Sequence, residues 1–286
     1  MKHILITGAS TGIGRALAES FLKRGDFVWA GVRNPEVLSS LKSQFPQTLE
    51  VLKLDVALAD EVTRALQVVQ ATRPQDFILI NNAGIALGGP VEAVDLNEWR
   101  KLFEVNVFGL LAMTQTFLPL LRQVKGRVIN IGSISGRMSS PFLAPYTSSK
   151  HAVRAISDSL RREMRSLGVK VVLIEPSPIR TEIWDKSIQH SRELEAKMTP
   201  ELQAVYSEAM ASLVGAVEDV AKNAVPVSHV IEAVENAVDL ENPYPYYLVG
   251  KNIHLQALLA RLLPVRAMDA IFAKGFRFQN TTKRSP

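Results

Sequence analysis

The sequence predicts an α/β fold built on one doubly wound parallel sheet with helices on both faces. Short apolar runs alternate with segments of helical periodicity through the first two-thirds of the chain. The runs are almost continuously hydrophobic, as in Phe77–Ile80, which is typical of strands buried on both faces of a parallel sheet. A glycine-rich turn joins the first run to the first helix. This alternation favours right-handed βαβ units and about seven parallel strands.

The expected elements follow this pattern in order. Strands are expected at His3–Thr7, Phe27–Val32, Glu50–Leu54, Phe77–Asn81, Arg127–Gly132, Val169–Ile174 and Tyr246–Val249. Helices are expected at Ile13–Lys23, Leu38–Phe45, Ala59–Ala71, Leu96–Gln123 and Ser148–Leu167. Asp95 and Glu98 form a candidate capping box, and Gly168 suits a helix C-terminus. After Ile174 the alternation ends and the composition becomes mostly helical, so we expect a single domain, 1–286, with an elaborated C-terminal third.

Composition indicates an ordinary globular chain. Of the 286 residues 47% are apolar and 21% are charged, and no cysteine is present, so disulfides and cysteine nucleophiles are excluded. The isolated histidines show no metal-ligand spacing, and we expect no metal. The apolar start meets Gly8 too soon for a signal peptide, and we expect a cytoplasmic protein. The net charge is +5, but basic and acidic residues are interspersed, so we expect no nucleic-acid partner.

The glycine-rich turn is the first candidate binding site. It reads Thr7-Gly8-Ala9-Ser10-Thr11-Gly12-Ile13-Gly14 and lies between a strand and a helix. Glycine permits positive φ and close approach of the backbone, and a helix N-terminus attracts phosphate. The spacing differs from the six-residue dinucleotide fingerprint, but its strand–turn–helix context is the same. A nucleotide is therefore the first expected ligand.

Arg33 indicates which dinucleotide binds. Enzymes that use NAD place an acidic residue about 20 residues beyond the glycine turn, to bond the ribose 2′-hydroxyl. Here Arg33 and Asn34 follow the second strand, and no acid occurs before Glu36. An arginine can hold a 2′-phosphate through charge-assisted hydrogen bonds. The sequence therefore favours NADP(H) over NAD(H).

Tyr146 and Lys150 are the candidate acid–base pair. They are four residues apart, so a helix places them on one face. A free phenol has a pKa near 10, and a nearby cation favours the phenolate. Ser133 follows the fifth strand and points to the same carboxyl edge of the sheet as the glycine turn.

Residues 4–181 resemble the short-chain dehydrogenase/reductase family, whose fold is Rossmann-like. The resemblance rests on ordered motifs: Thr7 to Gly14, Asp55-Val56, Asn81-Asn82-Ala83-Gly84, Asn106, Ser133, Tyr146-x-x-x-Lys150, and Pro176-Ser177-Pro178-Ile179-Arg180-Thr181. Each motif alone is a weak signal. Together, in order and at ordinary family spacing, they identify the chain as similar to this family.

The resemblance implies roles for these residues. Tyr146 would transfer the proton, Lys150 would bond the nicotinamide ribose, Ser133 would hold the substrate oxygen, and Asn106 would anchor a water in a proton relay. The implied cofactor contacts are Gly8, Ser10, Thr11, Gly12, Ile13, Gly14, Arg33, Asp55, Val56, Asn82, Ala83, Gly84, Tyr146, Lys150, Pro176, Ile179 and Thr181. Family members usually have glycine where this chain has Ser177, so that loop either tolerates serine or differs.

The resemblance is closest to the retinol and hydroxysteroid dehydrogenase branch. It implies an NADP(H)-dependent oxidoreductase that interconverts a hydroxyl and a carbonyl on a lipophilic or medium-sized substrate. Residues 182–230 would form a variable substrate lid, in which Trp184 contacts either the core or the substrate. A catalytically idle NADP(H)-binding sensor or scaffold is the alternative. The family also implies a homodimer or homotetramer.

Residues 251–276 form an amphipathic C-terminal extension, which Pro264 divides into two short helices. Three interpretations remain open for it. The extension packs on the domain or on a partner subunit, borders the substrate entrance, or rests on a membrane surface.

Overall fold

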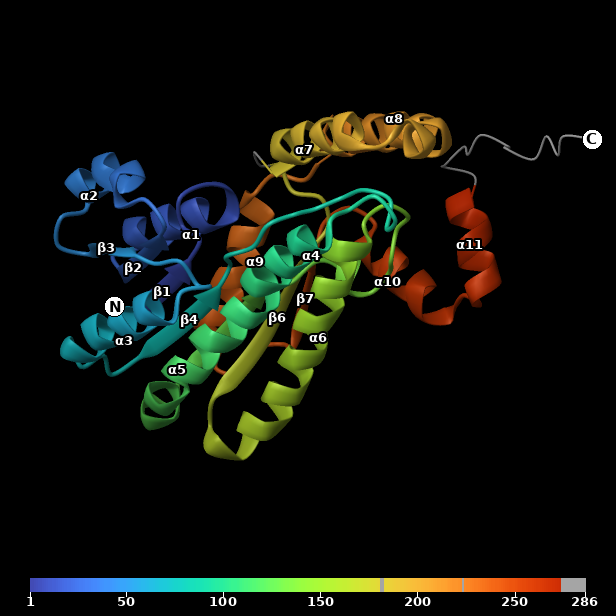
Figure 1. The fold of residues 1–286 in the computed structure, drawn as a ribbon. Helices are drawn as coiled ribbons and strands as arrows, with labels where there is room; N and C mark the ends of the chain where they lie inside the picture. The colour runs from blue at the N-terminus through green and yellow to red at the C-terminus, as the bar shows by residue number, and fades with distance from the viewer. Residues whose placement is uncertain (181–182, 223, 274–286) are drawn as a thin grey trace, which may run out of the picture.

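The computed structural model describes residues 1–180, 183–222 and 224–273, and its core is one seven-stranded sheet. All neighbouring strands are parallel, in the order β3-β2-β1-β4-β5-β6-β7 (Figure 1). The direction of the strand order reverses between β1 and β4. The strands are β1 (His3–Thr7), β2 (Phe27–Val32), β3 (Leu49–Lys53), β4 (Phe77–Asn81), β5 (Arg127–Ile131), β6 (Lys170–Pro176) and β7 (Tyr246–Val249). The predicted fold class is confirmed.

Helices cover both faces of the sheet. On one face α1 (Gly12–Lys23), α2 (Ser39–Gln44) and α9 (Ser228–Asp239) pack against alternate strand residues such as Ile4 and Ile6. On the other face α3 (Ala59–Ala71), α5 (Leu110–Val124) and α6 (Ala144–Met164) pack against Leu5 and Leu79. The alternation of side chains along each strand thus divides the apolar runs between two cores.

The long fourth helical segment differs from its expected form. It is predicted as one helix, but α4 (Leu96–Phe103) and α5 are separated by a π-helical turn, η2 (Glu104–Gly109). Asp95 caps α4 by accepting the N–H of Asn97 (2.7 Å). No return bond from Glu98 is found in the described structure, so the capping box is incomplete. Periodicity cannot show the π-turn, because it inserts one residue without interrupting the apolar face.

Two other helical segments also differ from their predicted bounds. The helix predicted to begin at Ser148 begins at Ala144, so Tyr146 lies inside its first turn, and Pro145 suits that position. The segment predicted at Leu38–Phe45 is a 3₁₀ turn, η1 (Pro35–Leu38), followed by α2. Gly168 adopts φ +77° after the 3₁₀ turn η4 (Arg165–Leu167), as its C-terminal position predicts.

The C-terminal third adds a layer beyond the sheet. Helices α7 (Ile183–Lys197) and α8 (Pro200–Lys222) lie side by side at one end of the molecule (Figure 1). After β7 the chain forms α10 (Ile253–Leu262) and α11 (Val265–Ala273), and Pro264 separates them as predicted. Helix α10 packs on β7.

The stretch Leu96–Val124 is apolar and long enough to cross a membrane by length and composition. Half of its most apolar window is buried, and α5 packs on β4 and α3. Phe117 is fully buried and stacks on Phe77, with ring centroids 5.5 Å apart. These contacts are those of a core helix.

Phe117→Ala should therefore destabilise the protein strongly. Removing a fully buried ring leaves a cavity between α5 and β4, so the free energy of unfolding should fall by about 3–5 kcal/mol. Phe108→Ala, at a position 53% exposed in the same helical stretch, is the matched control and should change it by less than about 0.5 kcal/mol. Urea denaturation of both variants measures the difference, and equal losses would contradict the assigned core.

Candidate functional site

The site lies where the strands end, at the carboxyl edge of the sheet. The turns after β1, β4 and β5 meet there because β4 pairs in parallel with both β1 and β5. Ligands bind at this edge in open α/β sheets, next to the place where the strand order reverses. The predicted residues Gly8, Asn82 and Ser133 therefore gather on one side of the molecule.

The turn after β1 packs closely against its neighbours only because it contains glycines. Gly8 has φ +66°, and a Cβ there would lie 2.9 Å from the Cα of Ala83. A Cβ on Gly14 would collide with the side-chain amide of Asn82 and with the carbonyl of Gly8. Helix α1 follows with no acidic residue in its first turn and no side-chain cap at Thr11. The free N–H groups and the dipole of this helix end suit a phosphate.

Thr7 connects the glycine turn after β1 to the turn after β4, a role that the sequence motif did not predict for it. Its Oγ1 accepts the backbone N–H groups of Asn82 and Ala83, both at 3.0 Å. The side chain of Asn82 returns hydrogen bonds to the carbonyls of Thr7 (2.9 Å) and Gly8 (3.1 Å). In the sequence, the threonine at the start of the glycine motif is the signal that could have indicated this role. These four hydrogen bonds, here called the Thr7 clasp, fix the turn after β4 against the glycine turn.

Arg33 is exposed at the end of β2 and makes no hydrogen bond or ion pair with the described residues. Arg15, by contrast, is engaged by Glu19 (2.6 Å) and by the carbonyl of Val37 (3.2 Å), which ties α1 to η1. Arg33 is thus the available cation on this side of the turn, as the sequence predicts.

Asp55 and Val56 follow β3 at the same edge. Asp55 accepts the N–H of Ala57 (3.0 Å), and its own N–H donates to Glu61 (2.7 Å). That hydrogen bond also lowers the pKa of Glu61, because it stabilises the carboxylate. Val56 is buried. The loop is therefore fixed in place before any ligand arrives.

Ser133, Tyr146 and Lys150 are brought together as predicted. Ser133 follows the end of β5 by two residues and caps the 3₁₀ turn η3 (Ile134–Gly136), and its side chain hydrogen-bonds to that of Tyr146. The ammonium of Lys150 lies 5.7 Å from the ring centre of Tyr146 and donates to the carbonyl of Ile131 (3.0 Å). Lys150 is buried, with 8% of its surface exposed.

Burial, rather than the neighbouring cation, dominates the titration of this pair. It raises the pKa of Tyr146, and the hydrogen bond from Ser133 opposes that rise without cancelling it. Burial also lowers the pKa of Lys150 from 10.5 to about 8. The sequence predicts the opposite direction for Tyr146. The prediction was wrong because sequence spacing does not reveal how far a phenol is desolvated.

Asn106 lies in the π-turn η2 and joins three parts of the site. Its Oδ1 accepts the N–H of Ile85 (2.8 Å), and its Nδ2 donates to the carbonyl of Ile85 (2.9 Å) and to Ser149 Oγ (3.0 Å). A Cβ on Gly84 would lie 3.4 Å from Asn106 Oδ1 and 3.8 Å from Lys150 Nζ. Asn106 therefore borders the space in front of Lys150, and its relay role stays a prediction.

The loop after β6 is described as far as residue 180 and accommodates Ser177. Ser177 has no positive φ, and its N–H donates to the carbonyl of Val249 (2.8 Å), so this position does not require glycine. Ile179 is buried and pairs with Val225. Pro176 ends β6. Thr181 lies outside the described residues, and so do the side chains of Glu182 and Trp184.

Known proteins share both the sequence and this arrangement. A family model for short chain dehydrogenases matches residues 2–192. The chain belongs to the short-chain dehydrogenase family. Over 97% of its length it is 37% identical to an NADPH-dependent 3-dehydrocapnine reductase of Ornithobacterium rhinotracheale, of which it covers 98%.

Two further likenesses extend this family assignment. Over 99% of its length the chain is 30% identical to estradiol 17-beta-dehydrogenase 2 of Mus musculus, of which it covers 77%. A Burkholderia cenocepacia short chain dehydrogenase, solved in complex with NADP, superimposes with a TM-score of 0.71 at 28% identity, over 96% of this chain and 99% of that one. The family predicted from the motifs is confirmed, and a hydroxysteroid-type enzyme is among the relatives.

Glu175 supports the short-chain dehydrogenase site through buried salt bridges, a role that the sequence motifs do not predict. It is fully buried at the end of β6 and forms salt bridges with Arg137 (2.5 Å) and Arg154 (2.9 Å). Arg137 follows η3, and Arg154 lies one turn beyond Lys150 on α6. Glu175 thereby ties together the segments that hold Ser133 and Lys150. No motif could have shown this pairing, because its partners are distant in sequence.

Apolar side chains of the segment predicted as a lid pack near Tyr146. Leu194 of α7 and Tyr146 both pack against the buried cluster of Leu87, Val94 and Leu102, and Leu194 also contacts a second cluster. That second cluster contains buried side chains from α8 and the neighbouring loops, namely Phe142, Met198, Ala209, Met210 and Leu213. The segment 182–230 thus contributes Leu194 to the cluster against which Tyr146 packs, and its role as a substrate lid stays a prediction.

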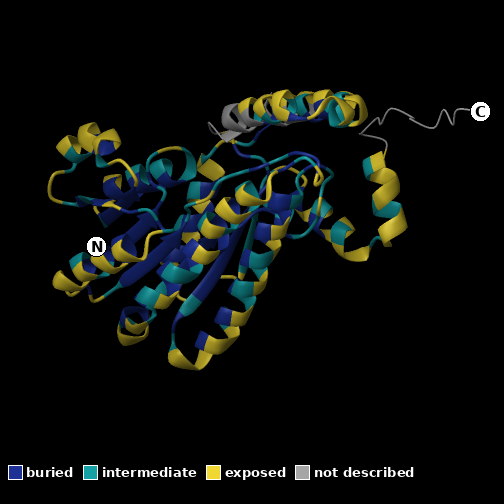
Figure 2. Cartoon of the chain, viewed as in Figure 1, coloured by how far each residue is buried: buried dark blue, intermediate teal, exposed yellow. Residues whose placement is uncertain are grey.

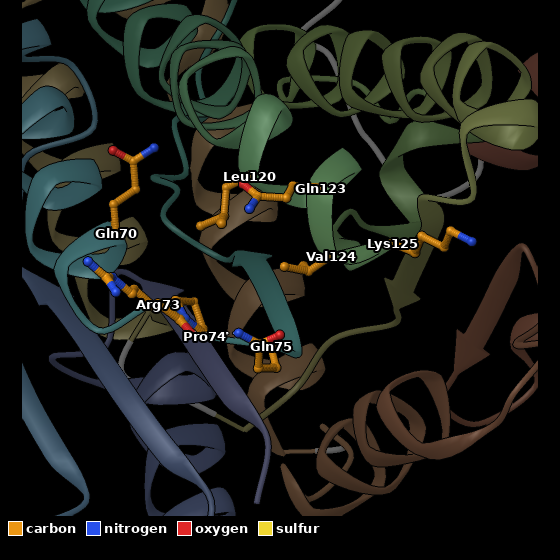
Figure 3. Close-up of a pocket in the computed structure, with 8 residues that line it drawn as sticks. All are labelled: Gln70, Arg73, Pro74, Gln75, Leu120, Gln123, Val124 and Lys125. Atoms are coloured by element: carbon orange, nitrogen blue, oxygen red, sulfur yellow. Dashed lines mark hydrogen bonds between the residues drawn. The ribbon is translucent and has the colours of Figure 1, made fainter.

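A hollow elsewhere on the surface does not contribute to this site. It lies between the ends of α3 and α5, where Arg73, Pro74 and Gln75 precede β4 (Figure 3). This is the opposite edge of the sheet. Its remaining lining residues are Gln70, Leu120, Gln123, Val124 and Lys125. Within the described residues, no group of histidine and acidic side chains could hold a metal ion.

Lys150→Met should make the protein more stable at neutral pH. A cation buried with a pKa of about 8 destabilises the folded state below that pH, so its removal should raise the free energy of unfolding by about 1–2 kcal/mol at pH 7. The loss of the hydrogen bond to Ile131 offsets part of the gain. Denaturant unfolding curves at several pH values measure the difference.

The pKa of Lys150 determines whether the stability of the protein rises or falls with pH. The unfolded state binds the proton up to pH 10.5 and the folded state only up to about 8, so the stability of the unsubstituted protein rises across that interval. The advantage of Lys150→Met should shrink there. Lys101→Met, at an exposed helix position, is the control. A variant that is less stable than the parent at every pH would contradict the burial of a strained cation.

Proposed function

We propose that the protein is an NADP(H)-dependent reductase that converts a carbonyl on a lipophilic or medium-sized substrate to a hydroxyl. The proposal rests above all on one observation: Tyr146 is hydrogen-bonded to Ser133, lies next to Lys150 and packs against an apolar cluster that Leu194 also contacts. The family assignment and the NADPH-dependent relative support it.

The described residues fit NADP(H). The glycine turn packs so closely that a Cβ at Gly8 or Gly14 would collide with neighbouring protein atoms, and it leads into a helix end without acidic residues. Arg33 provides a free cation where a 2′-phosphate requires one. Gly84 lies next to Asn106 and Lys150, and a Cβ there would be in van der Waals contact with both side chains. When bound, the nicotinamide supplies the hydride.

The chain's own residues supply the proton and hold the substrate. Because burial raises the pKa of Tyr146, its hydroxyl stays protonated at neutral pH and donates to the substrate oxygen as that oxygen gains negative charge. Ser133 donates a hydrogen bond to the same oxygen. The ammonium of Lys150 then stabilises the phenolate that Tyr146 becomes. With Tyr146 protonated, the site starts in the state that carbonyl reduction requires.

The lipophilic substrate is inferred from the lid. Leu194 packs against the same apolar cluster as Tyr146, and it also contacts the buried cluster of Phe142, Met198, Met210 and Leu213. Methionine side chains adapt to irregular apolar ligands. Among the relatives that carry substrate names, one is named for a dehydrocapnine, one for an estradiol and another for the smaller D-beta-hydroxybutyrate. We propose a ketone on a large apolar skeleton.

Tyr146→Phe tests the chemistry directly. Turnover of a carbonyl panel with NADPH, spanning retinoids, steroids and simple ketones, should fall about 10²–10⁴-fold because the proton donor is lost. NADPH affinity and melting temperature should stay close to those of the parent, as should all properties of Tyr244→Phe, whose residue is 69% exposed. Tight NADPH binding with no turnover of any carbonyl would instead identify a cofactor-binding sensor.

Arg33→Ala tests the choice of cofactor. The loss of a charge-assisted contact with the 2′-phosphate should weaken NADPH binding about 10–100-fold and leave NADH binding almost unchanged. Arg122→Ala, which removes an exposed cation from α5, should affect neither. Fluorescence titration with both nucleotides measures this, and equal losses for the two would contradict the assignment.

A further inference from the structure

The C-terminal helices carry a row of exposed apolar side chains. On α10, Leu255, Leu258, Leu259 and Leu262 are 55%, 51%, 36% and 65% exposed. Their spacing of three and four residues places them on one face of the helix. Val265 and Ile271 on α11 are 76% and 52% exposed. Soluble proteins seldom expose so many neighbouring apolar side chains without a function.

The opposite face of α10 anchors this row to the catalytic domain. Ile253 and Ala257 are buried against Ile134, with Met138 and Leu248 beside them. Ile134 follows Ser133 directly, so α10 is attached next to the catalytic segment. Helix α11 has no buried residue and stands away from the sheet (Figures 1 and 2). The leucines therefore face outward although α10 itself is firmly packed.

The positive charge of the chain is concentrated in the same segment. Residues 251–286 contain seven of the 33 lysines and arginines but only one of the 28 acidic residues, Asp269. Residues 1–250 therefore have 26 basic and 27 acidic residues, a net charge of −1. Lys251, Arg261 and Arg266 are exposed and make no ion pair with the described residues. The excess charge of the chain comes entirely from its C-terminal segment.

We propose that α10 and α11 dock the protein on an anionic lipid surface. Exposed leucines flanked by unpaired cations are the features that bind a helix at the interface of a negatively charged membrane. The apolar side chains enter the interface, and Arg261 and Arg266 contact lipid phosphates. A second copy of this chain would bring the same cations together, so the charge favours lipid over self-association. This docking does not depend on the proposed substrate.

Vesicle flotation with the full chain tests the proposal. The probes are vesicles of phosphatidylcholine alone and of equal parts phosphatidylcholine and phosphatidylglycerol. We expect binding to the anionic vesicles and little to the neutral ones. Raising the ionic strength from about 0.1 M to about 1 M, which shortens the screening length from about 10 Å to about 3 Å, should weaken it. Equal binding to both lipids, or none to either, would overturn the proposal.

Two variants locate the contact. Arg261→Ala/Arg266→Ala should lower the partition coefficient about thirtyfold, since each cation near the surface contributes about fivefold. Leu258→Glu/Leu262→Glu should abolish binding, whereas the control Leu58→Glu/Leu167→Glu, at exposed positions elsewhere, should bind like the parent. NADPH affinity verifies that each variant is folded.

The same variants distinguish lipid from a protein partner. Suppose that Leu258→Glu/Leu262→Glu reduced the oligomeric state in size-exclusion chromatography and that the parent did not bind anionic vesicles. The row of leucines would then be an interface between copies of the chain, and the proposal would be wrong. Retained vesicle binding by this variant would equally overturn it.

Discussion

The parallel pairing of β4 with β1 on one side and β5 on the other is the constraint on which the site depends. It brings the carboxyl ends of three strands to one edge, where Gly8, Asn82 and Ser133 follow β1, β4 and β5. Register is fixed by the two cores, because Ile4 and Ile6 face one helical layer and Leu5 faces the other. A slip of one residue would exchange these faces and displace every turn at the edge.

Buried polar contacts convert this arrangement into defined geometry. The Thr7 clasp, the three hydrogen bonds of the Asn106 side chain and the Glu175 salt bridges each join segments distant in sequence. Such groups are costly to bury unless they are paired, which makes the paired arrangement specific. Lys150 is the exception. The burial of its ammonium group lowers the stability of the fold at neutral pH. The same burial places a cation beside Tyr146, where negative charge develops during proton transfer.

Much of the fold could be predicted because apolar strands are local signals. The runs His3–Thr7, Phe27–Val32 and Phe77–Asn81 coincide with strands, and the motif residues converge at one edge. The π-turn at Asn106 and the partners of Glu175 could not be predicted, since both depend on packing between distant segments. The pKa direction of Tyr146 was wrong for the same reason. The position of the C-terminal leucines on α10 likewise required the structure, because the sequence alone left three interpretations open.

The central claim is that one edge of the sheet holds NADP(H) between Arg33 and Lys150 and presents Tyr146 to the substrate carbonyl. A crystal structure of the protein with NADPH tests this claim most directly. It should show the 2′-phosphate within hydrogen-bonding distance of Arg33, the pyrophosphate over the glycine turn and the nicotinamide beside Tyr146. A nucleotide bound at another edge, or one whose 2′-phosphate does not contact Arg33, would contradict the account.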